Sequence, residues 1–266
     1  MHRLALVLLP ALLLACATEP EPDVRGQAVD YRRGIAADDY RSSGERGNVT
    51  ITEVMWAGSV KGTGRDRVHD PDDVFIELQN KHPRPIHLTG WQISIEAGYF
   101  LDGISEPPSG NRARHTYIIP LRESRQPVQQ NEFVVIARKR DGAFDADYYI
   151  DDLALPDGPF EIVLTDIDNR LIESAGDARK PAFAGAWDRI TARSMERVQI
   201  IFNNRGDRDA AWHTYSLNDF DDGERLALHT TLRARVREAW RPLTGATPGM
   251  PNSPDYSGYI SSGSFE

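Results

Sequence analysis

Residues 73–94 read DVFIELQNKHPRPIHLTGWQIS, and this stretch decides the fold. Apolar residues occupy every second position from Val74 to Leu78, which predicts a strand with one buried face. A proline-rich turn follows. A second apolar segment then runs from Ile86 to Ile95 and is interrupted by Gly90 just before Trp91. Two short strands joined by a turn are typical of a β-protein rather than of a protein built on helices.

The same pattern continues on both sides of this stretch. Proline, glycine, aspartate and asparagine separate the segments, as expected of turns. Asp168 and Asn169 stand between two of the segments and predict a hairpin. The further strand segments are 48–56, 115–120, 132–137, 160–166 and 170–174. Many short strands with turns between them predict an all-β sandwich or barrel.

One segment has a different period. Between residues 223 and 240, Leu228, Leu232, Val236 and Trp240 recur every fourth position. This spacing predicts one inserted helix near 223–240 that packs on the β-domain. The alternative is an amphipathic helix lying on a membrane surface.

The order of these pieces resembles the lamin-tail domain, an immunoglobulin-like β-sandwich that is also found in secreted bacterial proteins. The resemblance rests on ITEV (51–54), FIELQN (75–80), IHLTGW (86–91), SMER (194–197), Trp212 and TPGMPN (247–252). Residues of the family motif fall here on Glu53, Ile76, Glu77, Asn80, Gly90, Trp91, Arg197, Trp212, Pro248, Gly249 and Asn252. The resemblance implies that these residues are structural.

Physical roles can be expected for several of them. Ile76 suits a buried strand face, and Asn80 suits a turn closed through its side chain. Gly90 suits a tight approach before Trp91 enters the core. Glu77 inside a strand needs a hydrogen-bond or ionic partner, for which Arg197 is one candidate.

Compared with the lamin-tail pattern, the chain has extra residues in four places. These insertions are residues 57–72, 97–114, 177–192 and 216–241. Loops of this length are usually functional or disordered. The insertions are therefore where we expect a specific partner to bind.

The N-terminus predicts export. Arg3 precedes an apolar run from Leu4 to Leu14, which is too short to span a bilayer. Leu13-Leu14-Ala15-Cys16 resembles a bacterial lipobox, which implies cleavage of residues 1–15 and lipid attachment at Cys16. Ala17 then favours the outer membrane of a Gram-negative cell. The alternative is an ordinary cleaved signal peptide.

The remaining organisation follows from composition. Residues 16–47 mix charges with proline, glycine and serine and predict a disordered tether after the lipidated cysteine. Residues 48–252 form the β-sandwich, and residues 253–266 a flexible tail. The net charge of −9 argues against nucleic acid as a partner.

Acidic clusters are the candidate metal ligands. Calcium prefers six to eight oxygen ligands, which close carboxylates can supply. The candidates are Asp70, Asp72, Asp73, Asp141, Asp145 and Asp147, with a further cluster at 218–224. The alternative is that all of them are solvated turns. His82 and His87 lack a third zinc ligand at motif spacing and are expected at the surface or its rim.

The sequence therefore predicts a lipid-anchored envelope protein whose β-sandwich is a non-catalytic module that binds an envelope protein or a glycan. No cofactor is expected apart from the possible calcium. The alternatives are a metal-assisted hydrolase that uses the acidic loops, a calcium-stabilised adhesin and a structural envelope component.

Overall fold

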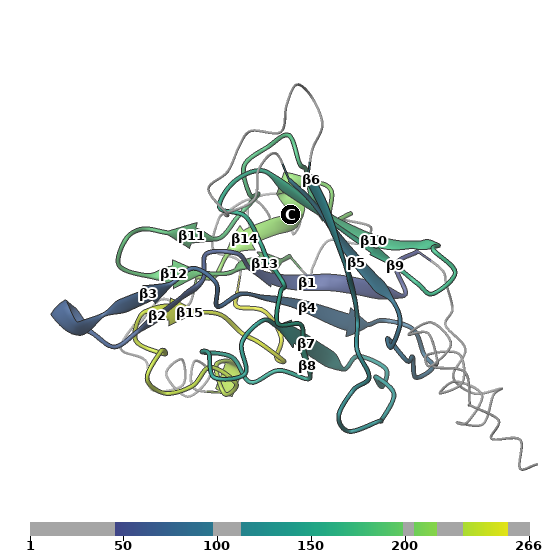
Figure 1. The fold of residues 1–266 in the computed structure, drawn as a ribbon, viewed down its shortest axis with the longest axis horizontal. Helices are drawn as coiled ribbons and strands as arrows, with labels where there is room; N and C mark the ends of the chain where they lie inside the picture. Colours follow the sequence, from purple (N-terminus) through teal and green to yellow (C-terminus); the bar gives the residue numbers. More distant parts are fainter. Residues whose placement is uncertain (1–45, 98–112, 199–204, 217–230, 255–266) are drawn as a thin grey trace, which may run out of the picture.

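The computed structural model describes residues 46–97, 113–198, 205–216 and 231–254. Fifteen strands in several sheets make up the regular structure of this part of the chain (Figure 1). Nearly all neighbouring strands pair antiparallel; the two parallel pairs are β7 with β8 and β12 with β15. The all-β class predicted from the alternating segments is confirmed.

The largest sheet has six strands in the order β14-β13-β1-β4-β7-β8. Its strands are β1 (Val49–Met55), β4 (Phe75–Asn80), β7 (Phe133–Ala137), β8 (Tyr148–Tyr149), β13 (Met195–Arg197) and β14 (Trp212–Thr214). A single 3-10 turn, η2 (Asp209–Ala211), leads into β14. The chain thus returns late to pair β13 with its first strand.

A second sheet has four strands in the order β10-β9-β5-β6. Its strands are β5 (Gln92–Ala97), β6 (Ala113–Ile118), β9 (Phe160–Thr165) and β10 (Leu171–Gly176). In β5 and β9 every second residue is buried, so one face of this sheet is covered and the other is open.

Two small sheets complete the structure. One has the order β11-β12-β15, and the other is the hairpin β2-β3. Their strands are β2 (Ser59–Lys61), β3 (Val68–Asp70), β11 (Ala186–Trp187), β12 (Ala192–Arg193) and β15 (Thr244–Gly245). The 3-10 turn η1 (Gly64–Asp66) lies in the hairpin loop.

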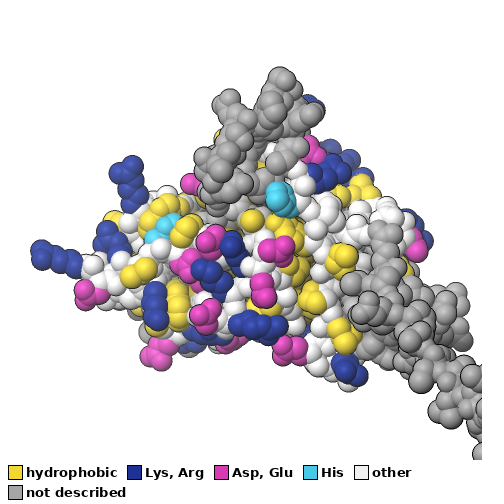
Figure 2. Space-filling model, in the orientation of Figure 1, with side chains coloured by type: hydrophobic (Ala, Val, Ile, Leu, Met, Phe, Trp, Pro, Cys, Tyr) yellow, Lys and Arg dark blue, Asp and Glu magenta, His cyan; other side chains and the backbone are white. Residues whose placement is uncertain are grey.

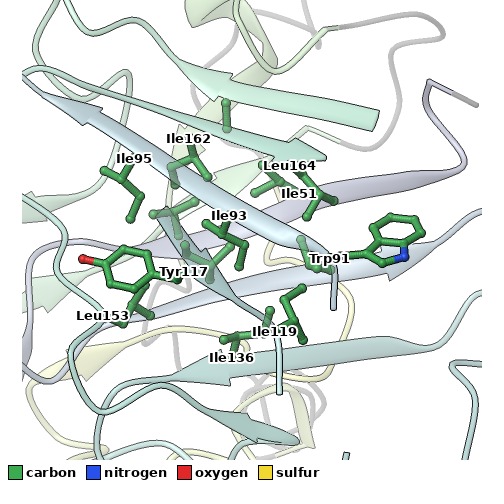
Figure 3. Packing of buried hydrophobic residues seen from close by; sticks show 14 of the residues in the cluster. Ile51, Trp91, Ile93, Ile95, Tyr117, Ile119, Ile136, Leu153, Ile162 and Leu164 are labelled. Carbon is green, nitrogen blue, oxygen red and sulfur yellow. The ribbon is translucent and has the colours of Figure 1, made fainter. Parts of the chain in front are cut away.

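The main core lies between the two large sheets. Figure 3 shows Ile93 and Ile95 of β5 pointing toward Ile51 of β1 and Ile136 of β7. Trp91 is fully buried in the same cluster. Apolar side chains of both sheets are thus removed from water, and this hydrophobic burial is the main force that holds the sheets together.

The six-stranded sheet has a second buried face. Every residue of β4 is buried, although its sequence alternates between apolar and polar. Phe75 belongs to a second cluster with Phe144, Val236 and Ala246. Glu77 lies on the face of Phe75, because side chains alternate along a strand. The polar positions of β4 therefore face protein, not water.

The predicted hairpin at Asp168-Asn169 is confirmed. Antiparallel β9 and β10 flank it, and Asn169 has a φ of 60°. The Asp166 carboxylate accepts the backbone N–H groups of Asp168 and Arg170, both at 2.9 Å. The left-handed conformation that an asparagine tolerates thus makes the turn.

The strand expected over 86–95 is broken in two. Ile86 forms only an isolated bridge with Val128, and β5 begins at Gln92. Gly90 between them has a φ of 81°, which residues with a side chain rarely adopt. Gly90 therefore makes the turn that delivers Trp91 to the core.

The helix expected over 223–240 is wrong in its described part. Only Thr231 and Leu232 have helical conformation, and the chain then runs through turns to Trp240. Val236 forms an isolated β-bridge with Phe144. Leu232 and Val236 are both buried by successive turns, which gives the four-residue spacing of apolar side chains, and Val236 packs in the cluster of Phe75. Residues 223–230 lie outside the described part.

Candidate functional site

Three of the four insertions converge on one end of the molecule. Residues 57–72 form the hairpin β2-β3, residues 177–192 contribute β11, and residues 231–241 belong to the last insertion. The backbone N–H of Gly62 donates to the Ala239 carbonyl at 2.9 Å, and the Lys61 ammonium lies 4.6 Å from the centre of the Trp240 ring. Figure 1 shows β2, β3, β11, β12 and β15 gathered on one side. Insertions that are far apart in the sequence thus lie side by side at this end.

An aromatic stack joins two of these insertions. The His69 ring lies parallel to the Trp187 ring, with centroids 3.8 Å apart and an interplanar angle of 9°. Figure 2 shows a histidine among hydrophobic side chains over β3 and β11. We call His69 and Trp187 the insertion surface, and both rings are half-buried. Lys61 lies on the opposite face of the β2-β3 hairpin, because Lys61 pairs with Val68 and His69 pairs with Val60.

Hydrogen bonds fix both insertions beside the stack. The Nε2 atom of His69 lies 2.9 Å from the Ala57 carbonyl oxygen. The Trp56 indole N–H donates to the Ala184 carbonyl at 2.8 Å and ties the insertion at 177–192 to the end of β1. A fixed tryptophan with a partly open face can bury an apolar group or a sugar ring at little entropic cost. The insertion surface is therefore suited to binding.

A second unusual feature is a row of buried glutamates. Glu196, Glu53 and Glu77 face one another in the register of β13, β1 and β4. All three are completely buried. His213 of β14 continues the row, with Nε2 3.6 Å from a Glu196 oxygen. Sequence reasoning singled out only Glu77 as an odd residue, because the alignment of the three glutamates depends on the strand register.

The C-terminal segment, residues 247–253, covers this row. Backbone N–H groups of Thr247, Gly249 and Ser253 donate to Glu53 at 2.9 Å, to Glu77 at 2.6 Å and to Glu196 at 3.0 Å, respectively. Gly249 has a φ of 76°, and an added Cβ would meet the Arg235 side chain at 2.4 Å. Pro248 next to it is buried. The motif TPGMPN thus supplies hydrogen-bond donors for buried carboxyls.

The row favours protonated carboxyls. Burial raises the pKa of Glu77 to about 8 and that of Glu196 to about 7. Burial and the neighbouring Glu196 and Glu77 raise the pKa of Glu53 well above its usual value. The Thr247 hydroxyl lies 3.3 Å from Glu53 and 2.8 Å from Glu196. It has one hydrogen to donate, so both contacts are hydrogen bonds only if one carboxyl is protonated.

Two further residues on which the resemblance rests bind backbone carbonyls. The Asn252 amide donates to the carbonyls of Thr52 in β1 and Arg197 in β13, at 2.9 and 2.8 Å. The Asn80 amide donates to the Arg84 and Val128 carbonyls, at 3.0 and 2.9 Å, and so closes the turn after β4. Both asparagines thus hold backbone segments together.

Arg197 does not take the place expected for it beside Glu77. Its guanidinium lies 3.9 Å from Glu173 and over the Trp212 ring, at 5.2 Å. Glu77 instead accepts the Thr52 hydroxyl at 2.6 Å in addition to the Gly249 N–H. A hydroxyl and a backbone amide, not a cation, satisfy this glutamate.

The acidic candidates lie close together but are neutralised. The Asp73 carboxylate accepts the Ser59 hydroxyl and the Ala143 N–H, which joins the two clusters, and burial raises its pKa. Basic side chains pair with most of the others: Asp70 with Lys139, Asp72 with Arg138, Asp145 with Arg237, and Asp147 with Arg122 and Arg235. Asp141 is exposed. Among the described residues no group of three or more His, Cys, Asp or Glu is placed to hold a metal ion.

The other candidate residues are the two histidines, Cys16 and the acidic cluster at 218–224. His82 is half-buried, but His87 is buried at 3% exposure, so the expectation of a surface or rim position is wrong for His87. Cys16, the tether up to residue 45 and the acidic cluster at 218–224 lie outside the described residues. Within the described ranges, no helix is long and apolar enough to cross a bilayer.

Comparison with models of known protein families gives no match for this chain. Comparison with curated proteins gives no match either.

Proposed function

We propose that this chain is a lipid-anchored binding protein of the cell envelope, built on a lamin-tail-type immunoglobulin-like β-sandwich. The motif residues support this architecture by their positions. Ile76 and Trp91 lie in the core between the two large sheets, and Asn252 joins β1 to β13. A shared core between a six-stranded and a four-stranded sheet is what a sandwich requires.

The proposed anchor is a lipid on Cys16, followed by a tether that lets the β-domain stand away from the bilayer. The lipobox-like LLAC at 13–16 supports it. Two or more acyl chains give stable membrane attachment. Ala17 supports placement in the outer membrane of a Gram-negative cell.

The observation that carries the binding function is the insertion surface. Two insertions that are separated in the sequence meet there and are joined by the His69–Trp187 stack. Ile190, which is 51% exposed, adds apolar area from the same insertion as Trp187. Tryptophan is enriched among residues that dominate binding energy. The proposed partner is an envelope protein or a glycan.

The test is binding of the whole chain to separated envelope fractions, one of membrane protein and one of cell-wall glycan. Trp187→Ala should weaken binding roughly thirtyfold, as expected for loss of a central tryptophan contact worth about 2 kcal/mol. Ile118→Ala is the control, because Ile118 is a 39% exposed apolar residue of β6, in the four-stranded sheet. Equal binding by Trp187→Ala and Ile118→Ala, or no binding to either fraction, would refute the proposal.

A further inference from the structure

A pocket of about 140 Å³ opens on the three-stranded sheet. It lies between β12, β15 and the turns that precede β15. Three arginines, Arg193, Arg233 and Arg241, line it together with neutral residues that include Tyr215, Leu243 and Thr244.

The pocket is distinct from the insertion surface. Trp187 pairs with Ala192, and Arg193 is the next residue of β12. Successive side chains of a strand point to opposite faces, so Arg193 and Trp187 lie on opposite faces of this sheet. The inference below therefore goes beyond the proposed function and is independent of it.

Within the described ranges, few carboxylates lie near the three guanidinium groups. Arg193 pairs there with Asp188, at 3.8 Å. Arg233 donates to the Thr244 carbonyl at 3.0 Å, and Arg241 donates to the Val236 carbonyl at 2.7 Å. Elsewhere Arg122 contacts two carboxylates, each at 2.7 Å. The shortage is local, since the whole chain has 40 acidic against 31 basic residues.

Hydrogen bonding within the protein is also incomplete. The Nε atoms of Arg193 and Arg233 are both buried, and neither has a hydrogen-bond partner in the part of the chain that the structure describes. Buried donors without acceptors are rare in folded proteins, because each one loses its bonds to water. Three like charges around one pocket also repel one another. An anion in the pocket would offset this repulsion.

We propose that this pocket binds a compact oxyanion of the phosphate class, either free or as the end group of a larger molecule. Arginine presents a planar fork of donors that matches phosphate oxygens. Three cations suit a group that carries a charge of about −2 near neutral pH. A volume of about 140 Å³ equals roughly four to five water molecules, at about 30 Å³ each, which fits a single phosphate group.

The test is calorimetric titration of the whole chain with inorganic phosphate, glycerol 3-phosphate and glucose 1-phosphate, at constant ionic strength set with chloride. Binding of all three indicates recognition of the phosphate group itself. Stronger binding of one ester identifies a lipid-headgroup-like or a sugar-linked source. No heat of binding from any of the three would overturn the proposal.

Substitutions test whether phosphate binds in this pocket. Arg193→Gln should weaken phosphate binding about tenfold, the loss of one charge-assisted contact worth about 1.4 kcal/mol. Arg114→Gln is the matched control: it also removes one positive charge, from β6, and should bind like the parent chain. Equal weakening by both variants would mean that phosphate responds to net charge alone, and the pocket assignment would fall.

A second variant acts in the opposite direction. Asp188→Asn removes the carboxylate nearest to Arg193 while keeping an acceptor for the Ile190 and Thr191 N–H groups. Phosphate should then bind severalfold more tightly, because a competing anion is gone. Unchanged or weaker binding in a folded Asp188→Asn chain would contradict a site at Arg193.

Discussion

Raising the pH from about 5 to about 7 should destabilise this protein, and Glu77→Gln should remove part of that loss. An exposed glutamate has a pKa of about 4.3, whereas burial raises the pKa of Glu77 to about 8. Between these values the folded chain holds a proton that the unfolded chain has released. Stability therefore falls as pH rises through this window, and the loss ends only above the folded pKa.

The size of the effect follows from proton counting. One proton held only in the folded state changes the free energy of unfolding by about 1.4 kcal/mol per pH unit. Over two pH units this amounts to about 3 kcal/mol, a large share of the stability of a single domain. Glu196, with a pKa raised to about 7, contributes in the same direction below that value. Two basic groups lie beside the row of buried glutamates: His213 is next to Glu196, and Arg235 is near Glu77.

Glutamine at position 77 should fit the site. Its carbonyl oxygen can accept the Gly249 N–H, and its amide can donate to the Thr52 hydroxyl oxygen, so both existing contacts keep a partner. The amide cannot titrate. The slope of stability against pH should therefore fall by about 1.4 kcal/mol per unit relative to the parent chain.

The assay is urea unfolding at several pH values for the parent chain, Glu77→Gln and Glu123→Gln. Glu123 is a control carboxylate with a 75% exposed side chain. Burial also raises the pKa of Glu173 and of Asp73, but this adds the same slope to all three proteins and cancels in the comparison. The reasoning is refuted if parent stability is flat or rises over this range, or if Glu77→Gln keeps the slope of Glu123→Gln.

Three further predictions concern the core, the anchor and the acidic loops. Trp91→Ala should cost about 3–5 kcal/mol in urea unfolding, because Trp91 is fully buried, and a loss below about 1 kcal/mol would contradict its core position. Cys16→Ser should release the protein from the membrane fraction; a mutant that still pellets after a high-salt wash would disprove the lipid anchor. Excess calcium should leave the melting temperature of the whole chain unchanged relative to chelator, because Lys139 and Arg138 already pair with Asp70 and Asp72. A shift of about 5–10 °C would instead show a metal site.

Strand positions were predictable because a strand with one buried face has apolar residues at every second position of the sequence. Seven segments read as strands correspond to β1, β4, β5, β6, β7, β9 and β10. The strands that were missed, such as β8, β11 and β12, have two residues each and are too short to show a period. The helix was misread for a related reason, since Leu232 and Val236 are buried by turns that happen to have helical spacing.

The site was less predictable than the fold. The calcium hypothesis considered carboxylates and left out the basic residues Arg138 and Lys139, which lie three and two residues before Asp141 and pair with the other acidic cluster. These basic residues were visible in the sequence. The alignment of the glutamates could not be predicted from the sequence, because nothing local relates Glu53 to Glu196. The arginine pocket likewise joins residues 193 and 233, which only the pairing of β12 with β15 brings together.

The C-terminal segment connects the buried row to both surface sites. Thr244 of β15 accepts the Val60 N–H of the hairpin at 2.8 Å, and β15 pairs with β12 beside the pocket. Three residues later the chain begins to cover the glutamates, at Thr247. Ionising the glutamate row should therefore loosen the segment that positions the hairpin and one wall of the pocket. Phosphate binding in the arginine pocket should then weaken as pH rises from about 6 to about 8, although phosphate itself gains negative charge over that range.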